Sequence, residues 1–192
     1  MKLFETLEMS KSTNVLSILM AAQKAPVATA TSTAASEFTM IKGSVISNSD
    51  SSYLLQFDGL SEPNPGASSG GAVLYAPDGS IVFEAGEFIP HATNNQAEYS
   101  GLILGLTHAK SFPVSSLRIE GDSMLIINQV AGKWKIKNDV LKALHAAVLE
   151  LLNDPAFVHV GIRHVYRDQN KHADKMTNDV MKTRESFYKV SV

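Results

Sequence analysis

The stretch LQFDGLSEPNPG, residues 55 to 66, sets an apolar run against a single carboxylate and follows it with turn-forming residues. Residues 53–57, YLLQF, have the composition of a buried strand. We expect this strand to end on Asp58, because glycine, asparagine and proline, which favour turns, follow within eight residues. An acid at the end of a buried strand is a candidate functional residue.

From residue 53 onward the chain shows regular strand and helix patterns. Three strands joined by turns come first, beginning with the strand at 53–57, and helices alternate with strands after them. This order predicts an α/β fold with a five-stranded mixed sheet, three antiparallel strands followed by parallel ones, and helices on both faces. The further strands are expected at residues 70–75, 80–88, 117–120 and 157–165, and the helices at 94–111, from Ser123 onward, at 138–152 and at 171–185.

Residues 1–52 differ in composition from the remainder. Nearly every residue from Ala25 to Ser36 is Ala, Ser or Thr, so we interpret residues 25–52 as a linker that buries too little apolar surface to fold alone. A short amphipathic helix at 12–24 is the alternative to a tail with chance periodicity, and it would dock a protein partner or serve as an organelle presequence. We expect a disordered tail at 1–52 and a catalytic domain at 53–185.

The amino-acid composition excludes some classes of protein. The 192 residues are 44% hydrophobic, carry a formal net charge of -2 and contain no cysteine. A globally basic nucleic-acid binder and a thiolate metal site are therefore excluded. No apolar run has the roughly 18 residues of a membrane span. We expect a soluble intracellular monomer in the nucleus or cytoplasm, with an organelle as the alternative.

Four acids fall at the ends of the expected elements. Such positions converge at one edge of an α/β sheet, although these acids are far apart in the sequence. Carboxylates held together repel one another unless a cation neutralises them, and hard oxygen ligands suit Mg²⁺ or Mn²⁺. Taken singly, an acid at such a position is explained equally well by a turn, a helix cap or the helix dipole. The four are Asp58, Glu98, Asp122 and Asp174.

Five separated motifs resemble type 1 ribonuclease H, in order and in spacing, over residues 53 to about 182. They are FDG, NPG, NNQAEYSGLILGL, GDS and HVYRDQNKHAD. The resemblance implies a ribonuclease H-like fold and an endonuclease that hydrolyses the RNA strand of RNA/DNA hybrids, leaving 5′-phosphate and 3′-hydroxyl ends. It also implies two Mg²⁺ ions, with Mn²⁺ as a substitute, held by the four acids, and it makes His164 the mobile histidine of the active site.

The resemblance also implies contacts with the hybrid. Asn64, Asn94 and Asn95 match residues that contact the minor groove and the RNA sugar. Thr93 and Asn138 match a pocket for a phosphate of the DNA strand, and Trp134 matches an aromatic that packs on a deoxyribose. Two alternatives stay open. A 3′–5′ exonuclease of the same fold would carry Asp-x-Glu on the first strand, and a non-catalytic hybrid-binding module would be expected to lack one or more of the acids.

Overall fold

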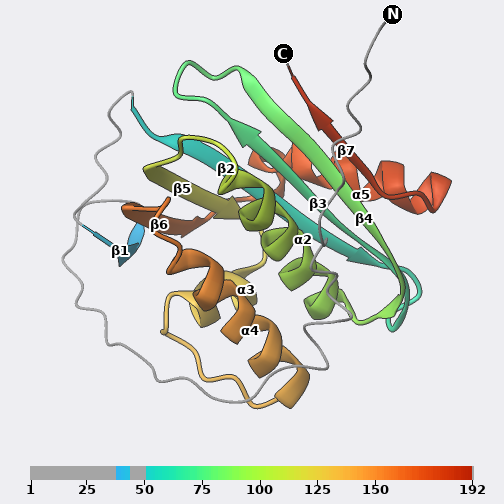
Figure 1. The fold of residues 1–192 in the computed structure, drawn as a ribbon. Coiled ribbons are helices and arrows are strands. Elements are labelled where there is room, and N and C mark those ends of the chain that lie inside the picture. The colour runs from blue at the N-terminus through green and yellow to red at the C-terminus, as the bar shows by residue number, and fades with distance from the viewer. Residues whose placement is uncertain (1–37, 44–50, 192) are drawn as a thin grey trace, which may run out of the picture.

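The computed structural model describes residues 38–43 and 51–191, and these residues form a mixed sheet with helices on both faces (Figure 1). The helices are α2 (Asn94–Ala109), α3 (Met124–Val130), α4 (Asp139–Leu152), α5 (Lys171–Thr183) and the short 3-10 helix η1 (Arg167–Gln169). The strands are β1 (Thr39–Lys42), β2 (Tyr53–Ser61), β3 (Gly66–Tyr75), β4 (Ile81–Ala92), β5 (Ser116–Gly121), β6 (His159–His164) and β7 (Phe187–Val190).

The sheet has seven strands within the described residues, where the sequence predicted five. Their order is β1-β6-β5-β2-β3-β4-β7. The expected part is correct, because β2, β3 and β4 are antiparallel neighbours and β2, β5 and β6 are parallel ones. The two additional strands lie at the edges, β1 antiparallel to β6 and β7 antiparallel to β4. Each has four residues, which is too short for a periodic pattern to predict it.

Strand β1 corrects the expectation that all of residues 1–52 lie outside the folded domain. Phe38, directly before β1, is 4% exposed, and the guanidinium of Arg163 lies 4.3 Å from the centroid of its ring. Lys42 at the end of β1 donates hydrogen bonds to the carbonyl oxygens of Leu152 and Asp154, at 3.3 and 2.9 Å. The helix predicted at 12–24 lies outside the described residues.

Two adjacent glycines of β3 show how closely the helices pack on the two faces of the sheet. A Cβ on Gly70 would lie 2.7 Å from the backbone nitrogen of Gly101 in α2, whereas a Cβ on Gly71 would lie 2.9 Å from the carbonyl oxygen of Ala173 in α5. Helix α2 is as close to β2, since a Cβ on Gly101 would lie 2.2 Å from the carbonyl oxygen of Asp58. Glycine therefore allows the backbones to approach one another at the point where Asp58 lies.

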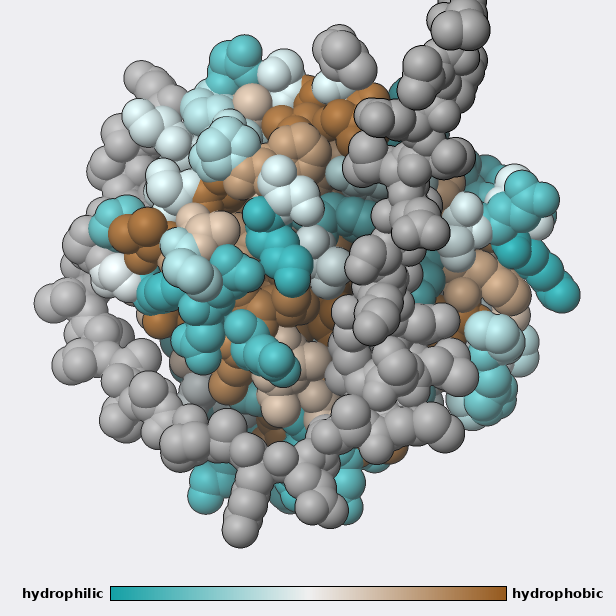
Figure 2. Space-filling view, in the orientation of Figure 1, coloured by the Kyte–Doolittle hydropathy of each residue, from teal (hydrophilic) through white to brown (hydrophobic). Residues whose placement is uncertain are grey.

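The apolar core lies between the sheet and helices α2, α3 and α4. Its largest fully buried side chains include Phe57, Phe83, Tyr99 and Phe157. Among the helices that the structure describes, none is long and apolar enough to cross a bilayer. On the face shown in Figure 2, hydrophobic residues are interspersed with hydrophilic ones.

Candidate active site

Three carboxylates from three different elements meet at one place. Asp58 belongs to β2, Glu98 to α2, and Asp122 follows the last residue of β5. Each offers an oxygen within 4.8 Å of the oxygens offered by the other two. The convergence predicted for these three acids is therefore present.

Sheet register places Asp58 and Asp122 side by side. In the parallel pair β2–β5, Gln56 lies opposite Glu120, and the pairing ends there. Two residues further along each chain come Asp58 and Asp122, with side chains on the same face. The prediction that the strand ends on Asp58 is wrong, because β2 continues to pair with β3 as far as Ser61. Asp58 instead lies in the part of β2 that pairs with β3 but no longer with β5.

Helix α2 brings the third acid to this point. Its N-cap is Thr93, whose hydroxyl accepts a hydrogen bond from the backbone N–H of Gln96 at 3.4 Å, and the Gln96 side chain accepts one from the backbone N–H of Thr93 at 2.7 Å. This capping box fixes the start of the helix. Glu98 lies four residues after Asn94, the first residue of the helix. Its backbone nitrogen would lie 2.0 Å from a Cβ on Gly59, so Glu98 is held directly against β2.

Burial and mutual repulsion make this acid group unfavourable without a cation. Asp58 and Glu98 are each 6% exposed. Burial, and then the charge of Asp122, raise the pKa of Asp58 to about 7, although hydrogen bonds from the Gly59 backbone and the Thr177 hydroxyl oppose the rise. Burial and the charges of Asp58 and Asp122 raise the pKa of Glu98 well above its ordinary value.

The donor set fits hard divalent cations. Oxygen Oε2 of Glu98 is buried and has no hydrogen-bond partner, which leaves a lone-pair site for a cation. Carboxylate oxygens are the ligands that Mg²⁺ and Mn²⁺ accept in proteins. The three acids could therefore hold such ions.

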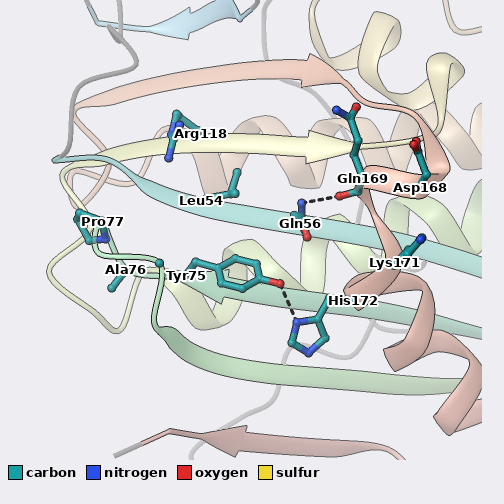
Figure 3. A pocket seen from close by; sticks show the side chains of 11 residues that line it. Leu54, Gln56, Tyr75, Ala76, Pro77, Arg118, Asp168, Gln169, Lys171 and His172 are labelled. Atoms are coloured by element: carbon teal, nitrogen blue, oxygen red, sulfur yellow. Dashed lines mark hydrogen bonds between the residues drawn. The ribbon is translucent and has the colours of Figure 1, made fainter.

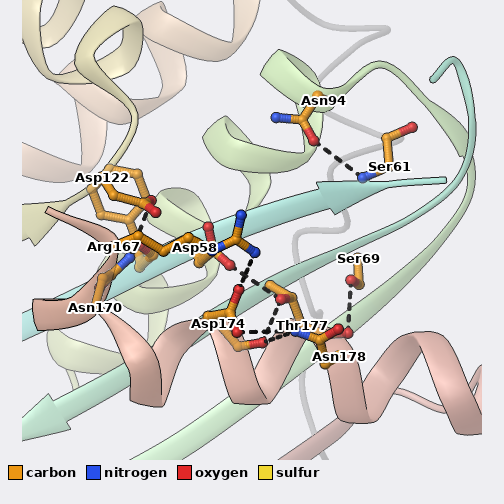
Figure 4. A network of polar contacts seen from close by, with 11 residues as sticks. Asp58, Ser61, Ser69, Asn94, Asp122, Arg167, Asn170, Asp174, Thr177 and Asn178 are labelled. Atoms are coloured by element: carbon orange, nitrogen blue, oxygen red, sulfur yellow. Dashed lines mark hydrogen bonds and ion pairs between the residues drawn. The ribbon is translucent and has the colours of Figure 1, made fainter. Parts of the chain in front are cut away.

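Asp174 lies beside this group, in the first turn of α5 (Figure 4). It is near enough for its charge to contribute to the raised pKa of Asp58. One carboxylate oxygen accepts a hydrogen bond from the guanidinium of Arg167 at 2.5 Å, and the other accepts one from the Asn178 amide at 3.1 Å. The same Arg167 charge opposes the rise in the pKa of Glu98. Arg167 thus compensates part of the negative charge of the acids.

Asn170 connects the acids to the fold in a way that the sequence did not predict. This fully buried residue at the N-cap of α5 donates hydrogen bonds from its amide to the Phe57 carbonyl at 2.9 Å and to Asp122 Oδ1 at 3.3 Å. It therefore ties α5 to β2 and to the loop after β5 (Figure 4). Arg167 and Asn170 both stand in the motif that contains Asp174. Their closeness to Asp174 in the sequence was the one feature that could have indicated a role for them in the site.

His164 ends β6 next to the acid group. Its Nε2 lies 3.1 Å from the Asp122 carbonyl oxygen, and because a carbonyl can only accept, Nε2 carries the proton of this hydrogen bond. In the parallel pair β5–β6, His164 lies opposite Gly121. The imidazole is therefore held at the backbone of Asp122.

The predicted substrate-binding residues fall into two groups. Asn64 and Asn94 are brought together, because the Asn64 side chain accepts a hydrogen bond from the Asn94 backbone at 3.0 Å; Thr93 and Asn95 flank Asn94 at the start of α2. Asn138 caps α4 by accepting a hydrogen bond from the Leu141 backbone at 3.0 Å. Trp134 is half-exposed between α3 and α4. Whether these residues touch a hybrid stays a prediction.

A hollow of about 370 Å³ lies beside the start of α5, and its lining includes residues of β2, β3 and η1 (Figure 3). The Gln56 amide donates a hydrogen bond to the Gln169 carbonyl at 3.0 Å, and the Tyr75 hydroxyl lies 2.7 Å from His172 Nδ1. The other ring nitrogen of His172 lies 2.6 Å from a Glu84 carboxylate oxygen. These bonds hold η1 on β2 and the first turn of α5 on β3 and β4, which positions Asp174.

Comparison with known proteins links this geometry to a family. A family model described as reverse transcriptase-like matches residues 56–180. Ribonuclease HI of Halobacterium salinarum is 40% identical over 125 residues, which are 65% of this chain and 62% of that protein. The chain thus spans about three fifths of the length of this curated relative.

Two solved structures have the same fold. The crystal structure of RNase H1 from Halobacterium salinarum is 38% identical with a TM-score of 0.65, and the match covers 68% of this chain and 98% of that one. The crystal structure of LC11-RNase H1 in complex with an RNA/DNA hybrid is 26% identical with a TM-score of 0.63, and the match covers 69% of this chain and 99% of that one.

Proposed function

We propose that this chain, which belongs to the type 1 ribonuclease H family, hydrolyses the RNA strand of RNA/DNA hybrids. The observation that carries the proposal is the group formed by Asp58, Glu98 and Asp122, whose oxygens lie within 4.8 Å of one another. Burial and mutual repulsion leave this group in need of positive charge. A relative of this family was solved bound to an RNA/DNA hybrid, which supports the same substrate class here.

Two Mg²⁺ ions, with Mn²⁺ as a substitute, would be held by the three acids together with Asp174. When bound, such ions activate a water on one side of the scissile phosphate and stabilise the departing 3′-oxygen on the other. Asp58 would be one of the ligands, and the charges of both Asp122 and Asp174 act on it. Products with 5′-phosphate and 3′-hydroxyl ends follow from this chemistry.

Arg167 and His164 would assist the acids. Arg167 donates to Asp174 at 2.5 Å and would hold this carboxylate in place as an ion ligand, while the exposed remainder of its guanidinium could contact a phosphate. His164 holds its Nε2 proton towards the Asp122 carbonyl, beside the acids. As an imidazolium, with both ring nitrogens protonated, His164 could pass the Nε2 proton to the leaving oxygen after a small movement of the ring, and it would remain as a neutral imidazole.

The substrate would be recognised from the two ends of the site. Asn64 and Asn94, joined by a hydrogen bond, and the neighbouring Asn95 present amide groups that can bond the edges of the minor groove and a 2′-hydroxyl. Trp134 would pack on a deoxyribose of the DNA strand. Thr93 and Asn138 would offer a hydroxyl and an amide to a phosphate, although each of them also caps a helix.

The proposal is tested by incubating the protein with an RNA/DNA hybrid labelled in the RNA strand. We expect internal cleavage with Mg²⁺, no cleavage after EDTA, and no cleavage of the same RNA alone or as an RNA duplex. The fragments should carry 5′-phosphate ends. Removal of single nucleotides from the 3′ end would instead identify an exonuclease, and tight hybrid binding without cleavage would identify a non-catalytic module.

We propose further that the catalytic domain begins at about residue 38. Deleting residues 1–37 should leave the cleavage rate of a short hybrid within about twofold. Deleting residues 1–43 should lower the melting temperature, because it exposes the edge of β6 and removes Phe38 from Arg163. Circular dichroism melts of the two deletions side by side measure the difference. Equal melting temperatures would show that β1 contributes nothing to the fold.

A further inference from the structure

Tyr166 is the most exposed of the large apolar side chains in the described chain, and the catalytic scheme above leaves it without a role. It is 76% exposed, against 50% for Trp134. It stands in the motif HVYRDQNKHAD, two residues after His164 and directly before Arg167. An aromatic side chain that stays in water beside a nucleic-acid site is a candidate for contact with the substrate.

The backbone beneath this ring is held firmly. The residue before it, Val165, donates a hydrogen bond to the Gly121 carbonyl at 3.0 Å, which ties the loop to β5. Gln169 closes the turn from both directions, because its side chain accepts from the Tyr166 backbone at 3.3 Å and its own backbone donates to the Tyr166 carbonyl at 2.8 Å. The Gln169 carbonyl in turn accepts from Gln56. A ring on such a support loses little entropy when it binds.

A hollow of about 340 Å³ lies against the ring. Its lining is formed by Arg163, His164, Val165, Tyr166 and Gln169. This volume is in the range of small-molecule sites and is large enough for one sugar unit. The cation in the lining is already neutralised, because the Arg163 guanidinium donates to the Glu120 carboxylate at 2.5 Å. The hollow therefore suits an uncharged polar group such as a sugar better than a free anion.

The ring and the hollow adjoin the acids through two neighbours. The His164 ring meets Tyr166 edge to face, with centroids 5.8 Å apart, and bonds the Asp122 carbonyl. Arg167, the next residue in the chain, binds Asp174. Both acids belong to the set that would hold the metal ions at the scissile phosphate. A nucleotide in the hollow would therefore belong to the strand that is cut.

We propose that Tyr166 and this hollow form a subsite for a ribose of the RNA strand, next to the scissile phosphate; this inference rests on the proposed function. In a duplex each base is covered above and below by its neighbours, so a side chain outside the helix reaches sugars and groove edges instead. The tyrosine ring packs on the sugar and fixes the RNA strand on this side of the acids. Tyr166 is thus a binding residue whose contribution does not depend on its hydroxyl.

The test compares Tyr166→Ala and Tyr166→Phe with wild type on an RNA/DNA hybrid. We expect Tyr166→Ala to raise KM about five- to tenfold with kcat within twofold, because a lost aromatic contact weakens nucleic-acid binding by about this amount. Tyr166→Phe keeps the ring and should stay within twofold in both constants. Tyr188→Ala, which removes a 42% exposed ring on β7, is the matched control and should also stay within twofold.

Hybrid dissociation constants, measured with each change added to Asp58→Asn so that no cleavage occurs, should show the same ranking. If Tyr166→Ala binds and cuts like wild type, the ring is not part of a subsite. If its kcat falls while KM is unchanged, the ring acts through His164, and the subsite is also refuted. If wild type neither binds nor cuts the hybrid, the proposed function itself fails, which separates the two failures.

Discussion

Replacing Asp58 with asparagine is expected to slow hybrid hydrolysis at least about a thousandfold, since a metal contributes several kcal/mol to the transition state. Asparagine has nearly the same volume as aspartate, so the β2 backbone and its close contact with Gly101 should be unchanged. Only the charge that would hold the ions is lost. Single-turnover rates with excess enzyme and saturating Mg²⁺ measure the effect on the chemical step, separately from product release.

The variant should bind the hybrid no more weakly than wild type when Mg²⁺ is absent. Asp58 would repel a phosphate, and this repulsion disappears with the carboxylate. The rate loss should therefore appear in the catalytic constant rather than in affinity. Substantial Mg²⁺-dependent cleavage by Asp58→Asn would show that the three clustered acids are not the metal site.

Glu87→Gln is a matched control for this variant. Burial alone raises the pKa of Glu87 to about 7, as burial and neighbouring charge do for Asp58, but Glu87 lies in β4 and is not a member of the acid group. Removing its charge should leave the hydrolysis rate within about threefold. A comparable loss in both variants would mean that buried carboxylates in general sustain the active fold, whatever their position.

Local sequence patterns were sufficient for the central part of the fold. The strands from β2 to β6 and the helices from α2 to α5 all bury apolar residues, and such apolar runs and periodicities are what a sequence reveals. The edge strands β1 and β7 were not predicted from such patterns, for a physical reason. Three of the four residues in β7 are exposed, and β1 is only partly buried, so neither has an apolar face of its own. Their pairing depends on β4 and β6, which are distant in sequence.

The site was predictable to a similar degree. The motifs indicated Asp58, Glu98 and Asp122, and the structure brings these three together. The roles of Arg167 and Asn170 could not be predicted, because they consist of hydrogen bonds to Asp174, Asp122 and Phe57 that only the folded chain creates. The position of Asp58 inside β2 was missed for a related reason, since its distance from the end of the strand is set by pairing with β3.

The raised pKa of Asp58 has a consequence for stability that can be measured without substrate. The folded protein, free of metal, holds a proton on this group up to about pH 7, whereas the ordinary value of 3.8 applies once the chain unfolds. Between these values the folded state binds more protons than the unfolded state. The stabilising effect of protonation is therefore complete below about pH 4 and is lost as the pH rises through 7.

We therefore expect the melting temperature of the wild type in EDTA to fall between pH 5 and pH 8 by more than that of Asp58→Asn. At pH 8 the variant should melt about 5 °C or more above wild type, because the difference in pKa corresponds to as much as about 4 kcal/mol and each kcal/mol shifts a domain of this size by about 2 to 4 °C. The difference between the two proteins cancels the contribution of Glu87, which titrates in both, and contains the charge of Asp58 together with its repulsion of Glu98.

Adding Mg²⁺ at pH 8 should reverse this order. Ions that bind the folded state alone stabilise it, and they bind best where protons no longer compete for the same oxygens. The wild type should thus gain more from Mg²⁺ at pH 8 than at pH 5, and Asp58→Asn should gain little at either pH. Glu87→Gln should also be stabilised in EDTA at pH 8, but it should keep the full response to Mg²⁺. Parallel melting curves for wild type and Asp58→Asn across this range, with equal gains from Mg²⁺, would contradict both the raised pKa of Asp58 and its place in the metal site.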